Sequence, residues 1–253
     1  MEAATAYGRS LQSLLTLGEQ LDEADWAAPT QCPLWSVADI YAHIIGPEVW
    51  FAGGAPAYDV TTQEFIDSHV AERRGRRPAE LVAELRDVLV VRRKQLDEAD
   101  KQPTVFIPRL HAYGPHELGL RMRLFDLWTH EQDIRVAVGR PGGLDTDSAR
   151  LAQDLLIQSL PRSIAKVAAA PPGSRVRITI LGEQPAEVAV AVDDAGRGAF
   201  IPAPDGAGLH LTMAWETFGR LCAGRGAVSG YAVDICGDPG LAQRVLTALN
   251  IAP

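Results

Sequence analysis

Hydrophobic residues recur at helical spacing along the first half of the chain, with charged residues between them. This pattern predicts an amphipathic helix over residues 3–23 and a second long helix that begins near Ser36. A third helix is expected after Pro78 and a fourth after Pro115, because proline suits the first position of a helix. Four long helices, with a crossover between the second and the third, predict a helix bundle. Bundles place metal sites on side chains of facing helices.

The pattern changes to alternation after residues 171–173, Pro-Pro-Gly. Residues 175–181 and 187–192 alternate hydrophobic and polar side chains, as half-buried strands do. Further strands are expected over residues 199–202, 209–213 and 231–236, and helices over residues 147–160, 215–222 and 238–249. The predicted fold class is therefore α+β with two domains. The N-terminal domain, residues 1–145, is a four-helix bundle, and the C-terminal domain, residues 146–253, contains a small, mostly antiparallel sheet.

Three irregular segments are also expected. The pair Gly46-Pro47 should kink or end the second helix, because proline cannot continue the hydrogen-bond ladder. Residues 102–114 should be irregular, since they carry no clear period. Pro161 should interrupt the helix that precedes it.

Composition and charge exclude several classes of function. The chain has 253 residues and 47% hydrophobic composition, enough for a sizeable core, and a formal charge of −8, which argues against a general nucleic-acid-binding protein. No apolar run approaches the roughly 20 residues of a membrane span, and the N-terminus lacks the pattern of a signal peptide. Three widely spaced cysteines fit a reducing compartment. We therefore expect a cytoplasmic protein with neither nucleic-acid nor membrane partners.

The fourth helix carries a candidate metal-binding pair. Asp126 and His130 are four residues apart, so both side chains leave the same face of the helix. A hydrogen bond across one turn is the ordinary explanation of such a pair, but His43 on the second helix supplies a third group. Two histidines and one carboxylate, with the remaining positions open, are typical of a catalytic zinc site.

Two further carboxylates have two interpretations each. Asp39 precedes His43 by one turn and could orient its imidazole, or it could only complete a capping box at the start of the helix. Asp133 could orient the imidazole of the fourth helix, or it could be structural and pair with Arg135 or Arg140.

Arg123 and the thiols are the remaining candidates near this chemistry. Arg123 lies three residues before Asp126 and could bind an anion at the rim of the site, or form a surface salt bridge. Cys32 and the other two thiols lack supporting histidine or aspartate spacing, so we interpret them as packing residues.

Several segments resemble a known family. Cys32-Pro-Leu-Trp-Ser-Val-Ala-Asp-Ile-Tyr-Ala-His43 resembles the signature of DinB-like metal-binding four-helix bundles. Residues 126–135, followed by Gly-Arg-Pro-Gly at 139–142, resemble the late signature of the mycothiol-dependent maleylpyruvate isomerase family. Residues 217–225 and 235–242 resemble the second, sterol-carrier-protein-like domain of that family. The resemblance covers nearly the whole chain, but its motifs are specific to the superfamily and not to one reaction.

The resemblance implies roles for individual residues. His43, Asp126 and His130 match the family's metal ligands, although the isomerase pattern has glutamate where this chain has Asp126. Zinc is the divalent metal that we expect. Arg225 matches a family arginine that reaches toward the active site from the second domain; the alternative is that Arg225 caps the carbonyls of its own helix. Arginine far outnumbers lysine in this chain, which agrees with an actinobacterial host, where mycothiol is abundant.

The reaction implied is the addition of a metal-bound thiolate, from mycothiol, to a small electrophilic substrate, as an isomerase or a thiol S-transferase. The expected partners are therefore a small-molecule electrophile and a low-molecular-weight thiol, and the protein is expected to be a monomer or a homodimer. Two alternatives remain open: a metal-dependent hydrolase with water in the open position, and a metal- or partner-binding module without catalysis. The three-ligand set favours the two enzymes.

Overall fold

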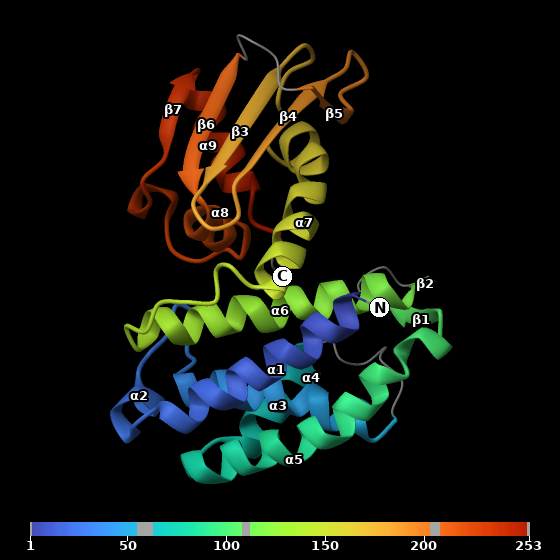
Figure 1. Ribbon diagram of the computed structural model, residues 1–253. Coiled ribbons are helices and arrows are strands. Elements are labelled where there is room, and N and C mark those ends of the chain that lie inside the picture. The colour runs from blue at the N-terminus through green and yellow to red at the C-terminus, as the bar shows by residue number, and fades with distance from the viewer. Residues whose placement is uncertain (1, 55–62, 108–111, 203–207, 252–253) are drawn as a thin grey trace. The chain divides into compact units, whose positions relative to one another are not determined.

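The computed structural model describes residues 2–54, 63–107, 112–202 and 208–251. The chain divides into two compact units, Met1–Gly142 and Gly143–Pro253. Among the described residues, the first unit combines helices with a two-stranded sheet, and the second combines helices with a five-stranded sheet (Figure 1), which confirms the predicted α+β class. No helix among the described residues is long and apolar enough to cross a membrane.

Four long helices form the bundle of the first unit: α1 (Glu2–Gln20), α3 (Val37–Ala52), α5 (Pro78–Asp97) and α6 (His116–Ala137). Helices α1 and α3 each pack against both α5 and α6, so the four enclose one core (Figure 1). Two shorter helices, α2 (Glu23–Ala27) and α4 (Gln63–Arg73), lie in the connections. Fully buried aliphatic side chains from all four long helices fill the core, among them Leu11, Leu14, Ile40, Ile44, Leu85 and Leu124.

Local sequence signals explain how α3 begins but not where it ends. The side chain of Ser36 accepts a hydrogen bond from the backbone of Asp39, and the Asp39 side chain accepts one from the backbone of Ser36. This reciprocal capping box was predicted. Helix α3 then continues through Pro47 to Ala52, so Gly46-Pro47 does not end it.

Residues 102–114, predicted to be irregular, contain a hairpin instead. Strand β1 (Thr104–Ile107) pairs antiparallel with β2 (Ala112–Pro115), which leads directly into α6. The prediction was wrong because strands of four residues are too short to establish an alternating pattern, and their stability depends on pairing with each other.

The sheet of the second unit has the strand order β5-β4-β3-β6-β7. Its strands are β3 (Arg175–Leu181), β4 (Ala186–Val192), β5 (Gly198–Ile201), β6 (Leu209–Ala214) and β7 (Asp234–Gly237). Strands β3 and β6 run parallel, and every other neighbouring pair is antiparallel. The mostly antiparallel sheet is therefore as predicted.

Three helices pack against this sheet: α7 (Asp147–Arg162), α8 (Trp215–Cys222) and α9 (Pro239–Ala248). The alternation in β3 buries Val176, Ile178 and Ile180, which form one face of the strand. Helix α7 runs through Pro161 and continues into a π-helical turn, Ser163–Val167. The expectation that Pro161 interrupts this helix was therefore wrong.

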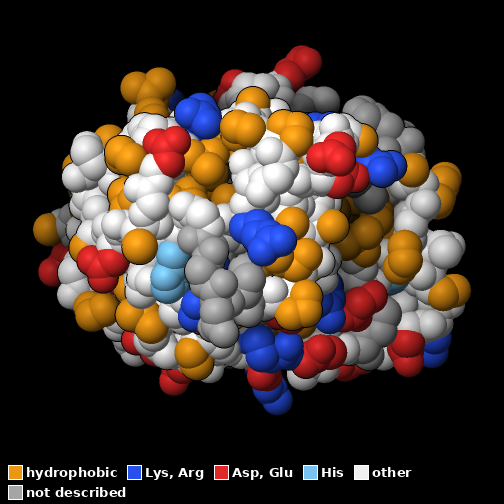
Figure 2. Space-filling view, turned by 90° about the horizontal axis from the view of Figure 1, so that it is seen from above, with side chains coloured by type: hydrophobic (Ala, Val, Ile, Leu, Met, Phe, Trp, Pro, Cys, Tyr) orange, Lys and Arg blue, Asp and Glu red, His pale blue; other side chains and the backbone are white. Residues whose placement is uncertain are grey.

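On the face of the molecule seen in Figure 2, acidic and basic side chains are interspersed with hydrophobic ones. Neither the acidic nor the basic side chains form a continuous patch on that face.

Candidate metal site

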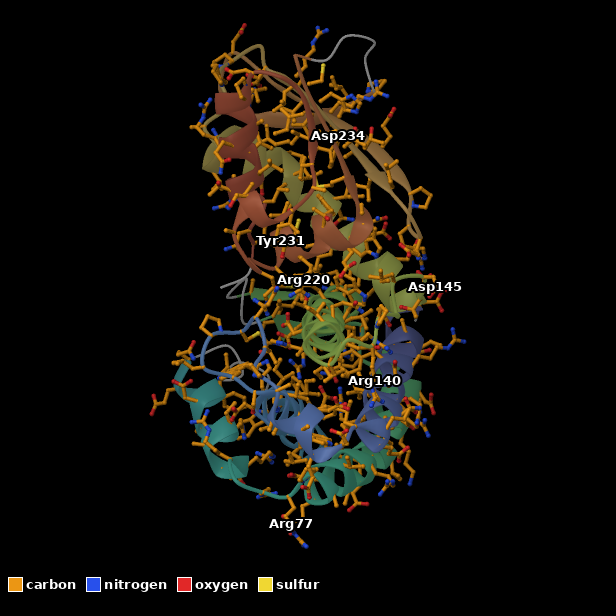
Figure 3. The ribbon with its side chains drawn as sticks, turned by 90° about the vertical axis from the view of Figure 1, so that its left-hand side faces the viewer. Arg77, Arg140, Asp145, Arg220, Tyr231 and Asp234 are labelled. Carbon is orange, nitrogen blue, oxygen red and sulfur yellow. The ribbon has the colours of Figure 1, made fainter. Side chains whose placement is uncertain are left out.

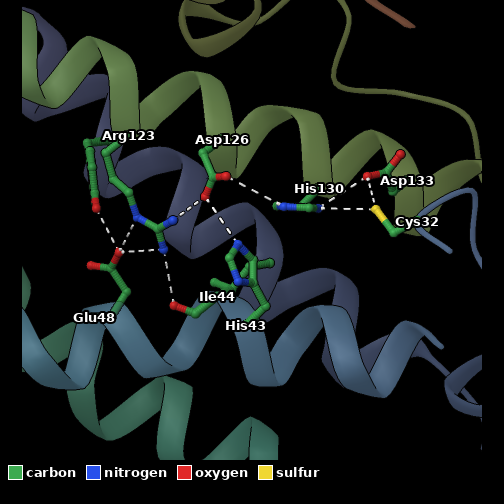
Figure 4. A network of polar contacts seen from close by, with 9 residues as sticks. Cys32, His43, Ile44, Glu48, Arg123, Asp126, His130 and Asp133 are labelled. Atoms are coloured by element: carbon green, nitrogen blue, oxygen red, sulfur yellow. Dashed lines mark hydrogen bonds and ion pairs between the residues drawn. The ribbon is translucent and has the colours of Figure 1, made fainter. Parts of the chain in front are cut away.

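Helices α3 and α6 bring His43, Asp126 and His130 together (Figure 4). Oδ2 of Asp126 lies 3.6 Å from Nε2 of His43, and Oδ1 lies 3.6 Å from Nε2 of His130. One ligand atom from each residue can be chosen so that all three lie within 4.8 Å of one another. The two imidazole side chains are buried, whereas the Asp126 side chain is 35% exposed, so the cluster opens to solvent on the Asp126 side.

The protonation states of the two histidines differ. Burial lowers the pKa of His43 to about 4, so its imidazole is neutral at neutral pH. Its Nε2 is buried and has no hydrogen-bond partner at normal distance among the described residues. Burial also opposes the charged form of His130, but the nearby Asp126 carboxylate and the hydrogen bond with Asp133 outweigh it and raise the pKa of His130 well above its usual value. An imidazole nitrogen without a hydrogen-bond partner and a carboxylate oxygen facing it are both suitable ligands for a divalent cation.

The far side of the His130 ring is held by two residues. Oδ2 of Asp133 lies 3.2 Å from Nδ1 of His130, and the Cys32 thiol donates to the same oxygen at 3.1 Å. The sulfur of Cys32 is 3.9 Å from Nδ1 of His130. A carboxylate that binds Nδ1 leaves Nε2 directed at Asp126, the usual way in which outer residues orient a metal-binding imidazole. The interpretation of Cys32 as a packing residue therefore missed its contacts with this cluster.

Trp35 lies over the two imidazoles. Its ring centroid is 4.9 Å from that of His43 and 6.0 Å from that of His130. Trp35 and Cys32 come from the same Cys-Pro-Leu-Trp segment, and this segment is the sequence signal that could have identified both as neighbours of the site.

The contacts of Asp39 and Asp133 separate their two interpretations. The Asp39 carboxylate accepts a hydrogen bond from Ser36 in the capping box and another from Arg74 at 2.9 Å. These contacts agree with the capping interpretation. Burial opposes the charged form of Asp39, but the hydrogen bonds from Ser36 and Arg74 lower its pKa. Asp133 contacts His130, whereas the arginines suggested for it have other carboxylates, Glu131 for Arg135 and Asp25 for Arg140.

Arg123 forms a buried salt bridge and not a surface one. Its Nη1 donates to Oδ2 of Asp126, and only 15% of its side chain is exposed. The opposite edge of the guanidinium contacts Oε1 of Glu48 through Nε and Nη2, both at 3.3 Å. Burial opposes the charged form of Asp126, but the positive charges of Arg123 and His130 outweigh it and hold the pKa of Asp126 well below its usual value.

Glu48 is the centre of a network that sequence reasoning missed. It is fully buried, and its carboxylate accepts from the Tyr7 hydroxyl at 2.7 Å and from Nε of Arg92 at 2.9 Å in addition to Arg123. These four residues come from α1, α3, α5 and α6, one from each long helix. A single acidic residue inside the hydrophobic run of residues 44–51 was the available signal.

Arg225 follows α8, between Gly224 and Gly226, both of which have a positive φ. Its Nη1 donates to the carbonyl oxygen of Ala223 at 2.7 Å, and the hydroxyl of Tyr231 (Figure 3) donates to the Arg225 carbonyl at 2.6 Å. Ala223 is the C-terminal cap of α8, so the capping contact considered for this arginine is present. Its role toward a substrate stays a prediction.

Comparison with known proteins identifies the family. The family model described as the mycothiol maleylpyruvate isomerase N-terminal domain matches residues 7–135. Two crystal structures, of the mycothiol-dependent maleylpyruvate isomerase and of a mutant form of it, are similar in fold: each has a TM-score of 0.51 and 15% sequence identity, and each alignment covers 92% of this chain and 88% of the other. No curated protein matches the sequence. The family model spans half of this chain, and we conclude that the chain belongs to the mycothiol maleylpyruvate isomerase N-terminal domain family.

Proposed function

We propose that this protein is a metal-dependent enzyme that uses mycothiol to attack a small electrophilic substrate, as an isomerase or a thiol S-transferase. His43, Asp126 and His130 would hold one divalent metal, zinc. The observation that carries the proposal is the buried, unpartnered Nε2 of His43, which faces the Asp126 carboxylate beside the His130 ring. A divalent metal bound there supplies a Lewis acid that lowers the pKa of a thiol brought to it.

The residues of the site have separate tasks in this proposal. His43 is neutral at neutral pH, so its imidazole has one lone pair for a metal without first losing a proton to the solvent. Asp133 and Cys32 fix the orientation of His130 by holding Nδ1. Asp126 is the most exposed of the three proposed ligands, so cofactor and substrate would approach past it. Trp35 packs on the imidazoles and limits access of water from its side.

The decisive experiment measures metal content and thiol-dependent turnover together. Wild-type protein should contain about one zinc per chain, and His43→Ala and His130→Ala should each lose most of it, since removing one of three ligands leaves an incomplete site. His116→Gln is the matched control, because it changes a histidine at the start of the same helix as His130 and should retain zinc. Stoichiometric zinc in His43→Ala would contradict the ligand assignment.

Turnover then distinguishes the reactions. The zinc-loaded protein should bind mycothiol and consume maleylpyruvate or another electrophile only when the thiol is present. Ester or amide hydrolysis without added thiol would support the hydrolase alternative. Zinc binding with no turnover of any substrate would support the binding module.

Arg225 is the proposed substrate-binding arginine of the second unit. A guanidinium can grip a carboxylate through two parallel hydrogen bonds. Arg225→Ala is expected to leave zinc content and melting temperature almost unchanged while thiol-dependent turnover falls by tenfold or more, about 1.4 kcal/mol. Full activity in this variant would return Arg225 to the capping role that its contact with Ala223 supports.

A further inference from the structure

The Arg123 guanidinium binds the side of the Asp126 carboxylate that a metal would share with His43 (Figure 4). Nη1 of Arg123 donates to Oδ2 of Asp126, and Oδ2 is also the oxygen that lies 3.6 Å from Nε2 of His43. The other oxygen, Oδ1, faces His130. A cation placed between His43 and Asp126 therefore meets an oxygen that already has a cationic partner.

The opposite edge of the same guanidinium is held on α3. Nε and Nη2 of Arg123 contact Oε1 of Glu48, and Nη2 is also 3.3 Å from the carbonyl oxygen of Ile44. These contacts do not involve Asp126. If Arg123 releases the Asp126 oxygen, its Nε and Nη2 therefore keep Glu48 and Ile44 as acceptors. The buried Glu48 carboxylate still balances its charge.

Glu48 does not depend on Arg123 for its own partners. The Tyr7 hydroxyl donates to Oε1 at 2.7 Å, and Arg92 donates to Oε2 at 2.9 Å. Arg92 is itself buried, and its guanidinium lies 5.6 Å from the Tyr7 ring centroid. Removal of the Arg123 charge would therefore leave the Glu48 carboxylate hydrogen-bonded and paired with a cation.

We propose that Arg123 is a positioning residue that sets the metal affinity of the site by competing for Asp126, and that Glu48 acts in the opposite sense. This inference rests on the proposed metal site. When no metal is bound, the guanidinium balances the charge of Asp126. A metal that binds must share Oδ2 with Arg123 or displace Arg123 from it, and it then lies beside the positive charge of the guanidinium. Both effects weaken binding, because two cations repel each other more strongly beside a largely buried side chain such as Arg123, which is 15% exposed, than in bulk water. Glu48 favours binding, since it adds a buried negative charge nearby and holds the displaced guanidinium.

The inference predicts effects of opposite sign from two residues that are not proposed ligands. Arg123→Gln should bind zinc tenfold or more tightly than the wild type, about 1.4 kcal/mol. Glu48→Gln should bind it tenfold or more weakly. Arg123→Lys keeps the positive charge but loses the planar fork that contacts Asp126 and Glu48 together, so its zinc affinity should lie between those of the wild type and Arg123→Gln. A purely structural role for the network would weaken binding in all three variants.

The experiment is a zinc titration of each apoprotein against a chromophoric chelator, with circular dichroism to establish that each variant is folded. Arg121→Gln is the matched control, because Arg121 lies on the same helix and pairs with Glu117 at 3.3 Å; its affinity should equal that of the wild type. The melting temperature is the second measurement. Apo Arg123→Gln should melt lower than apo wild type, and zinc should raise its melting temperature by more.

The outcomes separate the two proposals. Absence of zinc binding by the wild type would remove the proposed metal site itself. Zinc binding by the wild type, with equal or weaker binding by Arg123→Gln, would overturn the role of Arg123 and leave the metal site standing. If Arg123→Gln does not fold, Glu48→Gln decides, because binding as tight as that of the wild type in this variant would also overturn the inference.

Discussion

His43 and His130 are both buried beside Asp126, yet their surroundings give them opposite protonation behaviour. Burial dominates at His43 and lowers its pKa to about 4. At His130 the Asp126 and Asp133 carboxylates outweigh burial and raise the pKa. His43 can therefore accept a metal directly, whereas His130 must first lose a proton, so metal binding at neutral pH is expected to release a proton.

His43 should make the apoprotein less stable in mild acid. A histidine in the unfolded chain takes up its proton near its ordinary pKa of 6.5, whereas folded His43 does so only near 4, so the unfolded state binds more protons between these values. Stability should fall as the pH is lowered through this window, by roughly 3 kcal/mol in total, and this contribution should level off below it. The measurement is urea unfolding of the wild type and of His43→Phe, both with chelator to remove metal, at several pH values. The two proteins should differ in how the free energy of unfolding depends on pH. Equal pH dependence in the two proteins would contradict the prediction.

Asp133 should matter for metal affinity although it is not a proposed ligand. Asp133→Asn keeps the size of the side chain but removes the charge that holds Nδ1 of His130. Zinc affinity is expected to fall about 10- to 100-fold, the usual cost of losing an outer-shell carboxylate. Asp39→Asn is the control, since Asp39 contacts Ser36 and Arg74 at the start of α3 and should affect stability more than affinity. Equal losses of zinc affinity in the two variants would contradict a specific role for Asp133.

The four bundle helices are joined by one polar network in addition to their hydrophobic core. The buried carboxylate of Glu48, on α3, is its centre. It contacts Tyr7 on α1, Arg92 on α5 and Arg123 on α6. A buried carboxylate is tolerated only when its oxygens are hydrogen-bonded and its charge is paired. The network therefore constrains how the helices face one another directly beside the candidate metal site.

Removal of the Tyr7 hydroxyl should reveal the strength of this coupling. Tyr7→Phe deletes the donor that lies 2.7 Å from Oε1 of Glu48 while leaving the ring in the core. The free energy of unfolding should fall by about 1–3 kcal/mol, because a buried acceptor loses a hydrogen bond. Tyr113→Phe is the control: Tyr113 is 78% exposed, and urea unfolding should detect almost no change. A Tyr7→Phe variant as stable as the wild type would show that Arg92 and Arg123 satisfy Glu48 without the hydroxyl.

The charges around the site are balanced without a metal, although the chain as a whole carries −8. Asp126 has Arg123 and His130 as partners, and Glu48 has Arg92 and Arg123. The bundle also has an ordinary hydrophobic core contributed by all four long helices. Folding of the first unit is therefore not expected to require the ion.

Chelation should consequently lower stability without unfolding the protein. Loss of a ligand that binds only the folded state costs a few kcal/mol at most, according to its concentration relative to Kd. Helical circular dichroism at room temperature should stay unchanged on adding a chelator, while the melting temperature falls. Complete loss of the helical signal would show instead that the metal is structural.

Local patterns in the sequence were sufficient to predict the four helices, the capping box at Ser36, the main strands and the α+β class. They also identified His43, Asp126 and His130 as candidates, because the four-residue spacing on α6 places two side chains on one helical face wherever that helix packs. These properties depend on residues close together in the sequence.

Contacts between distant segments were decided only by the tertiary structure. Cys32 lies about one hundred positions before Asp133, and Tyr7, Glu48 and Arg123 come from three different helices, so no local period relates them. The β1–β2 hairpin likewise depends on pairing between strands too short to be recognised alone. Helix packing brings a guanidinium to the Asp126 oxygen and a thiol to the Asp133 carboxylate, and these partners determine the charge and orientation of the candidate metal site.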